Sequence, residues 1–384
     1  MASPNPTRVV TRSPPLALIV GRPQAAVMLI AAFGGSLLVA AVLWRWLGAR
    51  MSRDRWIRPN YRGRQIVAVS GLVALAAGAI AVIVTAAVVV SLPEAELRWA
   101  VFVPDHDPLL ARSPDSAVIA GGIAALVLLG GFGWLGYNDD TRGVLGEPHG
   151  QQGGGFRGHL RLSWERRRLT TGALKAVGGL VVAIAAVQIA LWGDPAEARD
   201  VVGAGPGGDW LRASAQLLGL GADPDAAWSA MALVRGVLIV ALSANLLNLL
   251  DRAPGRAVKA AFVWWLVALT PAALVAAGST GRLDLGFETS EWAVWAGAAV
   301  GASAGLLRSE LAEQHMLGDT GVNPVGAVVG MATVVAYPST VEWVVLAVLA
   351  VLNLSSERWS FSRVIDAVPP LRWLDRLGSP YRHT

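Results

Sequence analysis

The stretch that decides the fold class is AVIAGGIAALVLLGGFGWLGYNDD, residues 117–140. A long apolar run continues without a charge and then ends on Asn138 and two adjacent carboxylates, Asp139 and Asp140. One helix needs about 20 apolar residues to cross the hydrocarbon core of a membrane, so this run predicts a membrane span. Two neighbouring carboxylates repel each other unless a cation, a proton or an arginine lies between them. The pair therefore marks either the solvated end of a span or a functional site.

The composition of the whole chain agrees with a membrane protein. Of 384 residues, 54% are hydrophobic and only 15% are charged, and the mean hydropathy is +0.50. A soluble chain carries roughly a quarter charged residues. The chain has no cysteine, which excludes disulfide and thiol chemistry. Its basic residues are distributed among the loops between apolar runs, which is typical of membrane topology and not of nucleic-acid binding.

The apolar runs predict an all-α fold, a polytopic membrane helix bundle of about nine transmembrane helices. The predicted spans are residues 25–47, 66–90, 116–136, 172–192, 228–250, 257–277, 292–307, 322–337 and 341–354. No soluble domain is visible between them, so residues 1–384 form one integral membrane domain, with residues 355–384 as its C-terminal tail.

Loop charge predicts the orientation of the spans. The loops after the first and third spans are rich in arginine, whereas the loops after the second and fourth are acidic. Because basic loops stay in the cytoplasm, the N-terminus is expected outside and the C-terminal tail inside. Three arginines near the N-terminus oppose this scheme and are outnumbered. The chain is therefore expected in the cell membrane, with Asp139 and Asp140 at the cytoplasmic face.

Two further spans carry acids toward the same face. In NLLNLLD, Asn245, Asn248 and Asp251 are spaced three apart, which predicts one shared helical face. Asp319 lies in GDTG, residues 318–321, in a predicted tight turn before the eighth span. Such polar side chains are costly against lipid, so they should face the interior of the bundle. Because Mg²⁺ prefers hard oxygen ligands shared with phosphates, the acids predict a Mg²⁺ site beside a phosphate-binding surface.

Three motifs in this order, GYNDD, NLLNLLD and MLGDTG, resemble the polyprenyl-phosphate N-acetylhexosamine-1-phosphate transferase superfamily, which includes phospho-N-acetylmuramoyl-pentapeptide translocase. The resemblance covers most of the chain and extends to residues 60–72 and 155–175. It implies the transfer of a sugar 1-phosphate from a UDP-sugar to a polyprenyl phosphate, such as undecaprenyl or decaprenyl phosphate. UMP is released, and the product serves cell-envelope polymer synthesis. Members of the superfamily often form homodimers.

The resemblance also implies roles for individual residues. Asp319 is the first expected Mg²⁺ ligand, with Asp140 as a second, and Asp139, Asp140 and Asp251 form the expected catalytic group. The expected substrate-binding residues are Asn60, Arg157, His159, Lys175, Asn245 and Asn248. Lys175 is expected to pair with a phosphate. Direct attack by the lipid phosphate is favoured, because a phosphate monoester has a second pKa near 6 and needs no strong base at neutral pH.

Two departures from the family pattern leave other functions open. The aspartate motif continues as DRAPG, and no histidine-rich loop precedes the last span. An N-acetylhexosamine donor without a peptide is therefore expected, with Arg256, Lys259, Arg358 and Arg363 as candidate replacement cations. One alternative is a catalytically impaired member that acts as a scaffold or regulator of envelope synthesis. Another is a transporter, although its polar residues would lie near the membrane midplane and not at one face.

Overall fold

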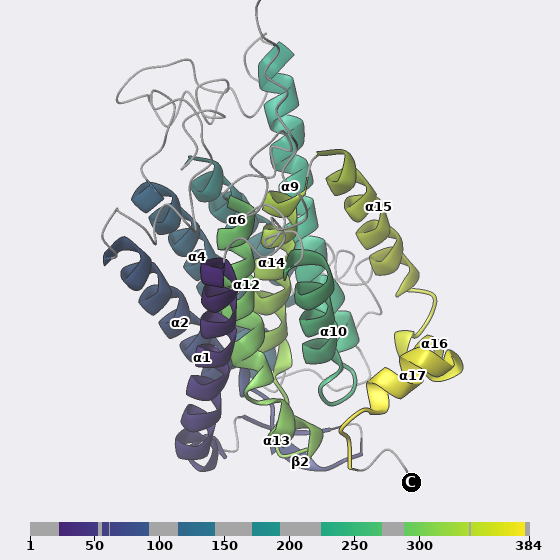
Figure 1. The fold of residues 1–384 in the computed structure, drawn as a ribbon. Helices are drawn as coiled ribbons and strands as arrows, with labels where there is room; N and C mark the ends of the chain where they lie inside the picture. The colour runs from purple at the N-terminus through teal and green to yellow at the C-terminus, as the bar shows by residue number, and fades with distance from the viewer. Residues whose placement is uncertain are drawn as a thin grey trace, which may run out of the picture.

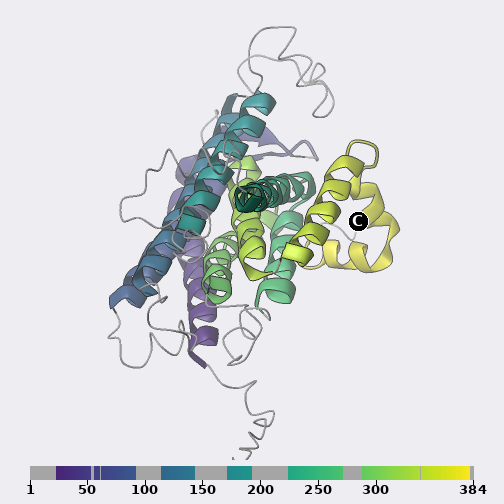
Figure 2. The same ribbon diagram turned by 90° about the horizontal axis from the view of Figure 1, so that it is seen from above.

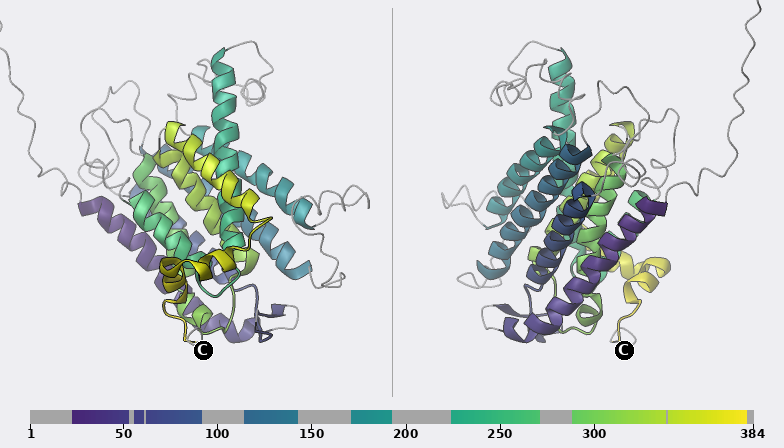
Figure 3. Two further views of the ribbon diagram at one scale, coloured as in Figure 1. Left: turned by 90° about the vertical axis from the view of Figure 1, so that its right-hand side faces the viewer. Right: turned by 60° about the vertical axis from the view of Figure 1, so that its left-hand side comes forward.

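The computed structural model describes residues 23–52, 56–60, 62–91, 114–142, 171–192, 224–270, 288–337 and 339–380. These residues form a mostly helical bundle (Figure 1), in which α9 is inclined to its neighbours (Figure 3). The long helices are α1 (Pro23–Leu47), α2 (Gly71–Ser91), α4 (Pro114–Arg142), α6 (Thr171–Trp192), α9 (Pro224–Leu250), α12 (Glu288–Ala304), α14 (Gly318–Ala336) and α15 (Ser339–Ser355). The short ones are η2 (Gly48–Met51), α10 (Arg256–Trp264), the π-helix η5 (Trp265–Leu269), α13 (Leu307–Leu311), α16 (Phe361–Ala367) and α17 (Pro369–Arg376).

Among the described residues, four helical segments are long and apolar enough to cross a membrane, which makes the chain a helical membrane protein. These segments are Val27–Met51, Gly71–Ser91, Val118–Thr141 and Ala230–Leu250. Shorter apolar helices cover Leu174–Ala190, Trp292–Ala304 and Thr340–Ser355. Large apolar side chains on the outside of the bundle, such as Ile30 and Val351, are exposed, as suits contact with lipid. Each predicted span overlaps a helix, while the number of crossings and their orientation stay predictions.

Helix α14 is the central helix of the bundle. Most of its side chains are buried, and α2, α4, α9 and α12 pack against it. Figure 2 shows α4 and α6 on one side of the bundle and α15 with the C-terminal helices on the other. Glycines permit the close approach: a Cβ on Gly326 would lie 2.6 Å from the carbonyl oxygen of Ser243, and one on Gly321 would lie 2.9 Å from the Cα of Gly71. Small residues at such crossings are how helices associate in membranes.

The second predicted span begins later than its sequence indicates. Ile66 belongs to strand β2 (Gln65–Val67), which pairs antiparallel with β1 (Ile57–Pro59). The backbone N–H of Met316, just before α14, donates to the carbonyl oxygen of Val67 at 2.8 Å. The prediction that residue 66 opens the span is wrong, because this residue pairs with a hairpin strand and α2 starts only at residue 71.

Helices α4 and α14 extend past their predicted bounds into segments that carry the predicted site acids. Helix α4 continues to residue 142, so Asp139 and Asp140 are helical. Helix α14 begins at Gly318, whose φ of +68° suits glycine, and Asp319 lies in its first turn. The GDTG motif is therefore a helix N-terminus and not a separate turn.

A buried ion pair joins α9 to α15. Nε of Arg235 donates to Oε2 of Glu342 at 2.8 Å, and Nη2 donates to Oε1 at 3.3 Å. Both residues are buried, and the guanidinium also lies 5.4 Å from the ring centroid of Trp343. Each charge is thus compensated by the other inside the bundle and not by water.

Replacing Arg235 alone should destabilise the bundle. Arg235→Leu leaves the carboxylate of Glu342 buried without its cation, which costs about 3–5 kcal/mol of unfolding free energy. Replacing both residues by leucine should cost less, because no unpaired charge remains. Thermal unfolding in one detergent measures both variants. A double variant that is less stable than Arg235→Leu would contradict this account.

Candidate functional site

Side chains from four helices meet at the end of the bundle that carries β2 and α13, the lower end in Figure 1. Nζ of Lys175, on α6, contacts Oδ2 of Asp319 on α14 and lies 3.8 Å from Oδ2 of Asp139 on α4. Nδ2 of Asn248, on α9, donates to the same Asp319 oxygen at 3.2 Å. We call Asp139, Lys175, Asn248 and Asp319 the acid–lysine cluster. All four are residues that the sequence predicts for the site.

Asp140 makes a different set of contacts. Its carboxylate accepts hydrogen bonds from the backbone N–H of Asp319 at 3.2 Å, from that of Thr320 at 2.8 Å, and from Oγ1 of Thr320 at 2.6 Å. N–H groups in the first turn of a helix have no partner within the helix, and the helix dipole favours an anion there. Asp140 therefore caps α14. Asp139, and not Asp140, is the carboxylate that lies beside Lys175.

Two glycines of the motifs allow this arrangement. A Cβ on Gly136 would lie 2.6 Å from the backbone nitrogen of Thr320 and closer still to the carbonyl oxygen of Asp319. A Cβ on Gly318 would lie 2.7 Å from Oδ2 of Asp140. The glycines of GYNDD and GDTG are thus the points where α4 and the start of α14 touch.

The residues of NLLNLLD do not share one face. Asn248 faces Asp319, whereas Asn245 is exposed and donates through Nδ2 to Oδ1 of Asn353, on α15, at 2.7 Å. Asp251 lies beyond the end of α9. Positions three apart in a helix are about 60° short of a full turn, and α15 packs on the side of α9 to which Asn245 is turned. The expectation of a common face therefore fails for Asn245.

Asp251 lies against a second acid, Glu310, which the sequence does not single out. They belong to a cavity of about 60 Å³, whose lining residues are Asn60, Ile66, Asp251, Arg252, Ala253, Pro254, Glu310, His315 and Met316. Burial raises the pKa of Asp251, and the charges of Glu310 and Asp319 raise it further. Burial also raises the pKa of Glu310 to about 7. Oε2 of Glu310 has no hydrogen-bond partner among the described residues.

Glu310 should make the stability of the protein depend on pH. Between its ordinary pKa of 4.5 and its folded pKa of about 7, the unfolded chain has lost this proton and the folded chain keeps it. The free energy of unfolding should therefore fall as the pH rises through this window. Glu310→Gln removes that contribution. Thermal midpoints measured from pH 4.5 to above 7 test this, and parallel curves for the wild type and Glu310→Gln would contradict it.

Asn60 is tied to the hairpin and to the loop before α14. Its Nδ2 donates to Oε2 of Glu313 at 3.1 Å, and its Oδ1 accepts from the backbone N–H groups of Arg62 and Arg64, both at 2.9 Å. These bonds position the hairpin turn, while the residue also lines the small cavity. The other two predicted substrate-binding residues of the loops, at positions 157 and 159, lie outside the described residues.

His315 fastens the same loop to the bundle in its neutral form. Its ring nitrogens lie 2.7 Å from Oγ of Ser70 and 2.8 Å from Oγ of Ser309. Burial lowers the pKa of His315 to about 3. The imidazole is thus uncharged at neutral pH and serves as a hydrogen-bonding link in front of Gly318.

Two candidate replacement cations hold the C-terminal helices. Arg256 donates through Nε and Nη2 to the carboxylate of Asp375 at 2.8 and 3.1 Å. Nζ of Lys259 donates to the carbonyl oxygens of Leu374 and Asp375 at 3.2 and 2.8 Å. These contacts attach α17 to the start of α10. Arg358 and Arg363, in the tail, are exposed.

The donor set can be compared with what Mg²⁺ requires. No group of three or more Asp, Glu, His or Cys side chains that could hold a metal ion occurs among the described residues. Mg²⁺, however, is usually held by one or two carboxylates together with substrate phosphates. Asp139 and Asp319 both contact or lie close to the ammonium of Lys175, so two hard carboxylates already gather around one positive charge. The residues therefore fit a Mg²⁺ that is shared with phosphates.

No family model matches the chain, and no curated protein matches it either. The fold and the site define a class on their own: a helical membrane protein with two carboxylates, a lysine and an amide gathered at one end of its bundle.

Proposed function

We propose that the protein is a Mg²⁺-dependent glycosyl-1-phosphate transferase that moves a sugar 1-phosphate from a UDP-sugar to polyprenyl phosphate and releases UMP. The observation that carries the proposal is the acid–lysine cluster, because GYNDD, NLLNLLD and GDTG each contribute one residue to it. If the acids only marked the water-exposed ends of separate spans, their side chains would have no reason to meet. Charged residues inside a helix bundle are costly unless they have a function or a partner.

Phosphoryl transfer depends on the positioning of the reactants and the neutralisation of their charge more than on covalent catalysis by the protein. An oxygen of the lipid phosphate attacks the phosphorus that bears the sugar, and the bond from that phosphorus to UMP breaks. Asp139 and Asp319 would hold Mg²⁺, which neutralises phosphate oxygens when bound. Lys175 has three N–H donors and would turn from Asp319 to a phosphate. Asn248 keeps the Asp319 carboxylate oriented, and Asp140 fixes the backbone that carries it.

The side of the membrane is also a proposal. The arginine-rich loops predict that the cluster lies at the cytoplasmic face of the cell membrane. A nucleotide sugar would then be used on the side where it is made. An N-acetylhexosamine without a peptide is the proposed sugar, so UDP-GlcNAc is the first donor to test.

A direct assay tests the proposal. Purified protein is incubated with polyprenyl phosphate, Mg²⁺ and a panel of UDP-sugars that includes UDP-GlcNAc and UDP-MurNAc-pentapeptide, and UMP is measured. UMP release that requires both the lipid phosphate and Mg²⁺ supports the proposal. Turnover of the pentapeptide donor alone would overturn the choice of sugar, and no turnover with any donor would overturn the transferase function.

A second candidate is a catalytically impaired member that acts as a scaffold or regulator. Its support is that Lys175 contacts Asp319 directly and that Pro254 stands in the DRAPG segment where the family has an acid. This candidate predicts no UMP release under any condition of the assay, together with a stably folded protein.

The two neighbouring aspartates should respond differently to the same change. Asp139→Asn should lower activity and raise the Mg²⁺ concentration needed, because a carboxylate beside Lys175 loses its charge. Asp140→Asn should mainly lower stability, by about 1 kcal/mol, because the amide keeps only one acceptor oxygen and no charge for the three donors of Asp319 and Thr320. Mg²⁺ titrations of UMP release and thermal midpoints separate the effects. Identical changes in both measurements would contradict the separate roles.

A further inference from the structure

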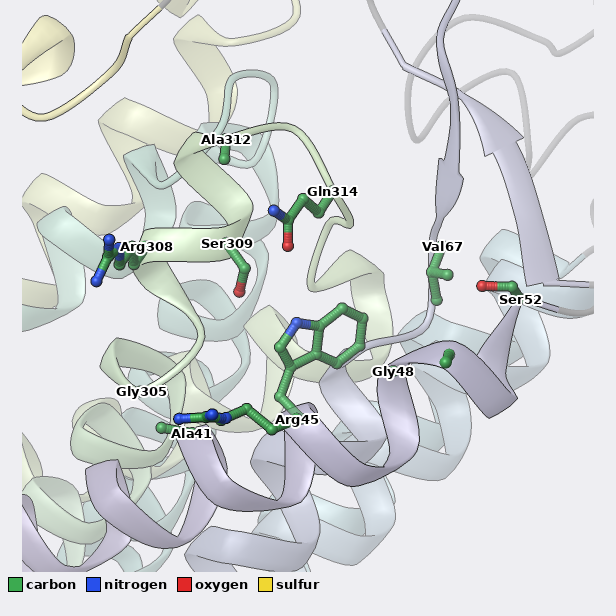
Figure 4. Close-up of a pocket in the computed structure, with 12 residues that line it drawn as sticks. Ala41, Arg45, Gly48, Ser52, Val67, Gly305, Arg308, Ser309, Ala312 and Gln314 are labelled. Atoms are coloured by element: carbon green, nitrogen blue, oxygen red, sulfur yellow. The ribbon is translucent and has the colours of Figure 1, made fainter.

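A cavity of about 810 Å³ lies where α1 ends, between η2, β2 and the segment from α12 to α13 (Figure 4). Cavities of about 300–1,000 Å³ are typical of small-molecule sites. Arg45 on α1 and Arg308 on α13 both line it, and Figure 4 shows both side chains toward the left of the view. None of its lining residues is acidic. The cavity is therefore basic, unlike the acid–lysine cluster.

The basic cavity shares a wall with the small cavity that Asp251 and Glu310 line. Val67 and Gln314 line the basic cavity, whereas their chain neighbours Ile66 and His315 line the small cavity of Asp251. Successive side chains of a strand point to opposite faces, which explains why β2 serves both cavities. The two cavities thus lie back to back across β2 and the loop before α14.

The charges of the basic cavity are not neutralised within the described part of the chain. Neither Arg45 nor Arg308 has an ion-pair partner among the described residues, and both side chains are exposed. By contrast, Arg62 and Arg64 lie 3.4 and 3.6 Å from the carboxylate of Glu313. Two guanidinium groups beside a cavity favour an anion, and guanidinium binds phosphate through paired N–H donors.

The outer surface of α1 connects this cavity to the membrane. Leu38, Val42 and Trp46 are spaced four apart, so they share one face, and they are 64%, 50% and 72% exposed. An exposed tryptophan at the end of an apolar helix is typical of the membrane–water interface. Arg45, next to Trp46, is therefore expected near the depth of lipid headgroups, and its cavity adjoins an apolar surface that suits acyl chains.

We propose that the cavity between α1 and α13 binds the phosphate of an anionic lipid headgroup, with Arg45 and Arg308 as its cations. The lipid is favoured over free phosphate because the apolar face of α1 adjoins the cavity. This site is independent of the transferase function, since it lies behind the wall that separates it from Asp251 and uses none of the cluster residues.

Native mass spectrometry of the full-length protein in neutral detergent tests this. Short-chain phosphatidylglycerol is titrated in parallel with phosphatidylcholine of the same acyl length, and inorganic phosphate is added as a competitor. The double variant Arg45→Gln/Arg308→Gln removes both charges. Ala49→Trp fills the cavity from its lining and keeps both arginines. Arg50→Gln is the matched control, because Arg50 is exposed on η2, bonds the carbonyl oxygen of Trp46 and does not line the cavity.

The wild type and Arg50→Gln should bind phosphatidylglycerol at least about tenfold more tightly than the double variant, as expected for two lost charge-assisted contacts. Ala49→Trp should also lose binding, and phosphatidylcholine should bind weakly to all forms. Equal binding of phosphatidylglycerol by the wild type and the double variant would overturn the site. Displacement of the lipid by inorganic phosphate would overturn the assignment to a lipid and leave a site for phosphate itself.

Discussion

Asp319→Asn should reduce UMP release by at least about 100-fold, the scale on which a single preorganised electrostatic contact at a reacting group acts. The Asp319 carboxylate is the acceptor shared by Lys175 and Asn248. The substitution keeps the size of the side chain and removes its charge. The backbone N–H of Asp319 still donates to Asp140, so the start of α14 should stay intact.

The loss of activity in Asp319→Asn should arise without unfolding of the protein. A matched variant distinguishes lost activity from lost stability. Asp366→Asn makes the same change at an exposed acid on α16 and should leave both activity and thermal midpoint near those of the wild type. Initial rates are measured at equal Mg²⁺ concentrations, with thermal midpoints of the same preparations. Wild-type rates for Asp319→Asn would exclude Asp319 as a metal or phosphate-site residue.

The position of the acid–lysine cluster could be predicted from the sequence because its signal is local. GYNDD and GDTG each place a glycine and an acid within a few residues at the boundary of an apolar run, and loop charge predicts one common face. The capping role of Asp140 could not be predicted in this way. It depends on how closely Gly136 approaches α14, and that distance follows from packing and not from either motif.

The sequence does not predict the positions of three other residues, because their surroundings are set by tertiary contacts and not by the local sequence pattern. Ile66 is apolar and adjoins an apolar run, so only its pairing with β1 reveals it as a strand residue. Glu310 carries no motif, and its pKa is raised by burial, which only the folded structure reveals. Asn245 shares a spacing with Asn248, but α15 lies on its side of α9 and provides Asn353 as a partner.

Gly136→Ala should separate α4 from α14 and thereby disrupt the site. The added Cβ would meet backbone atoms of Asp319 and Thr320, including the Thr320 nitrogen at 2.6 Å. Backbone cannot rotate away as a side chain can, so one helix must shift. Overpacking costs typically about 1–3 kcal/mol and sometimes more, and this contact should lie at or above the upper end. The shift would also lengthen the hydrogen bonds from Thr320 to Asp140, so activity should fall along with stability.

Gly130→Ala is the control, because Gly130 lies on the same helix and a Cβ there would meet no atom within 4 Å. Alanine is favoured over glycine in a helix by up to about 1 kcal/mol, so this variant should be as stable as the wild type or more so. The two identical substitutions are thus expected to change stability in opposite directions. Thermal unfolding in one detergent, with UMP release from the same samples, measures both. A Gly136→Ala protein that matches Gly130→Ala in midpoint and rate would show that α4 and α14 do not touch at this point, and the capping role of Asp140 would no longer stand.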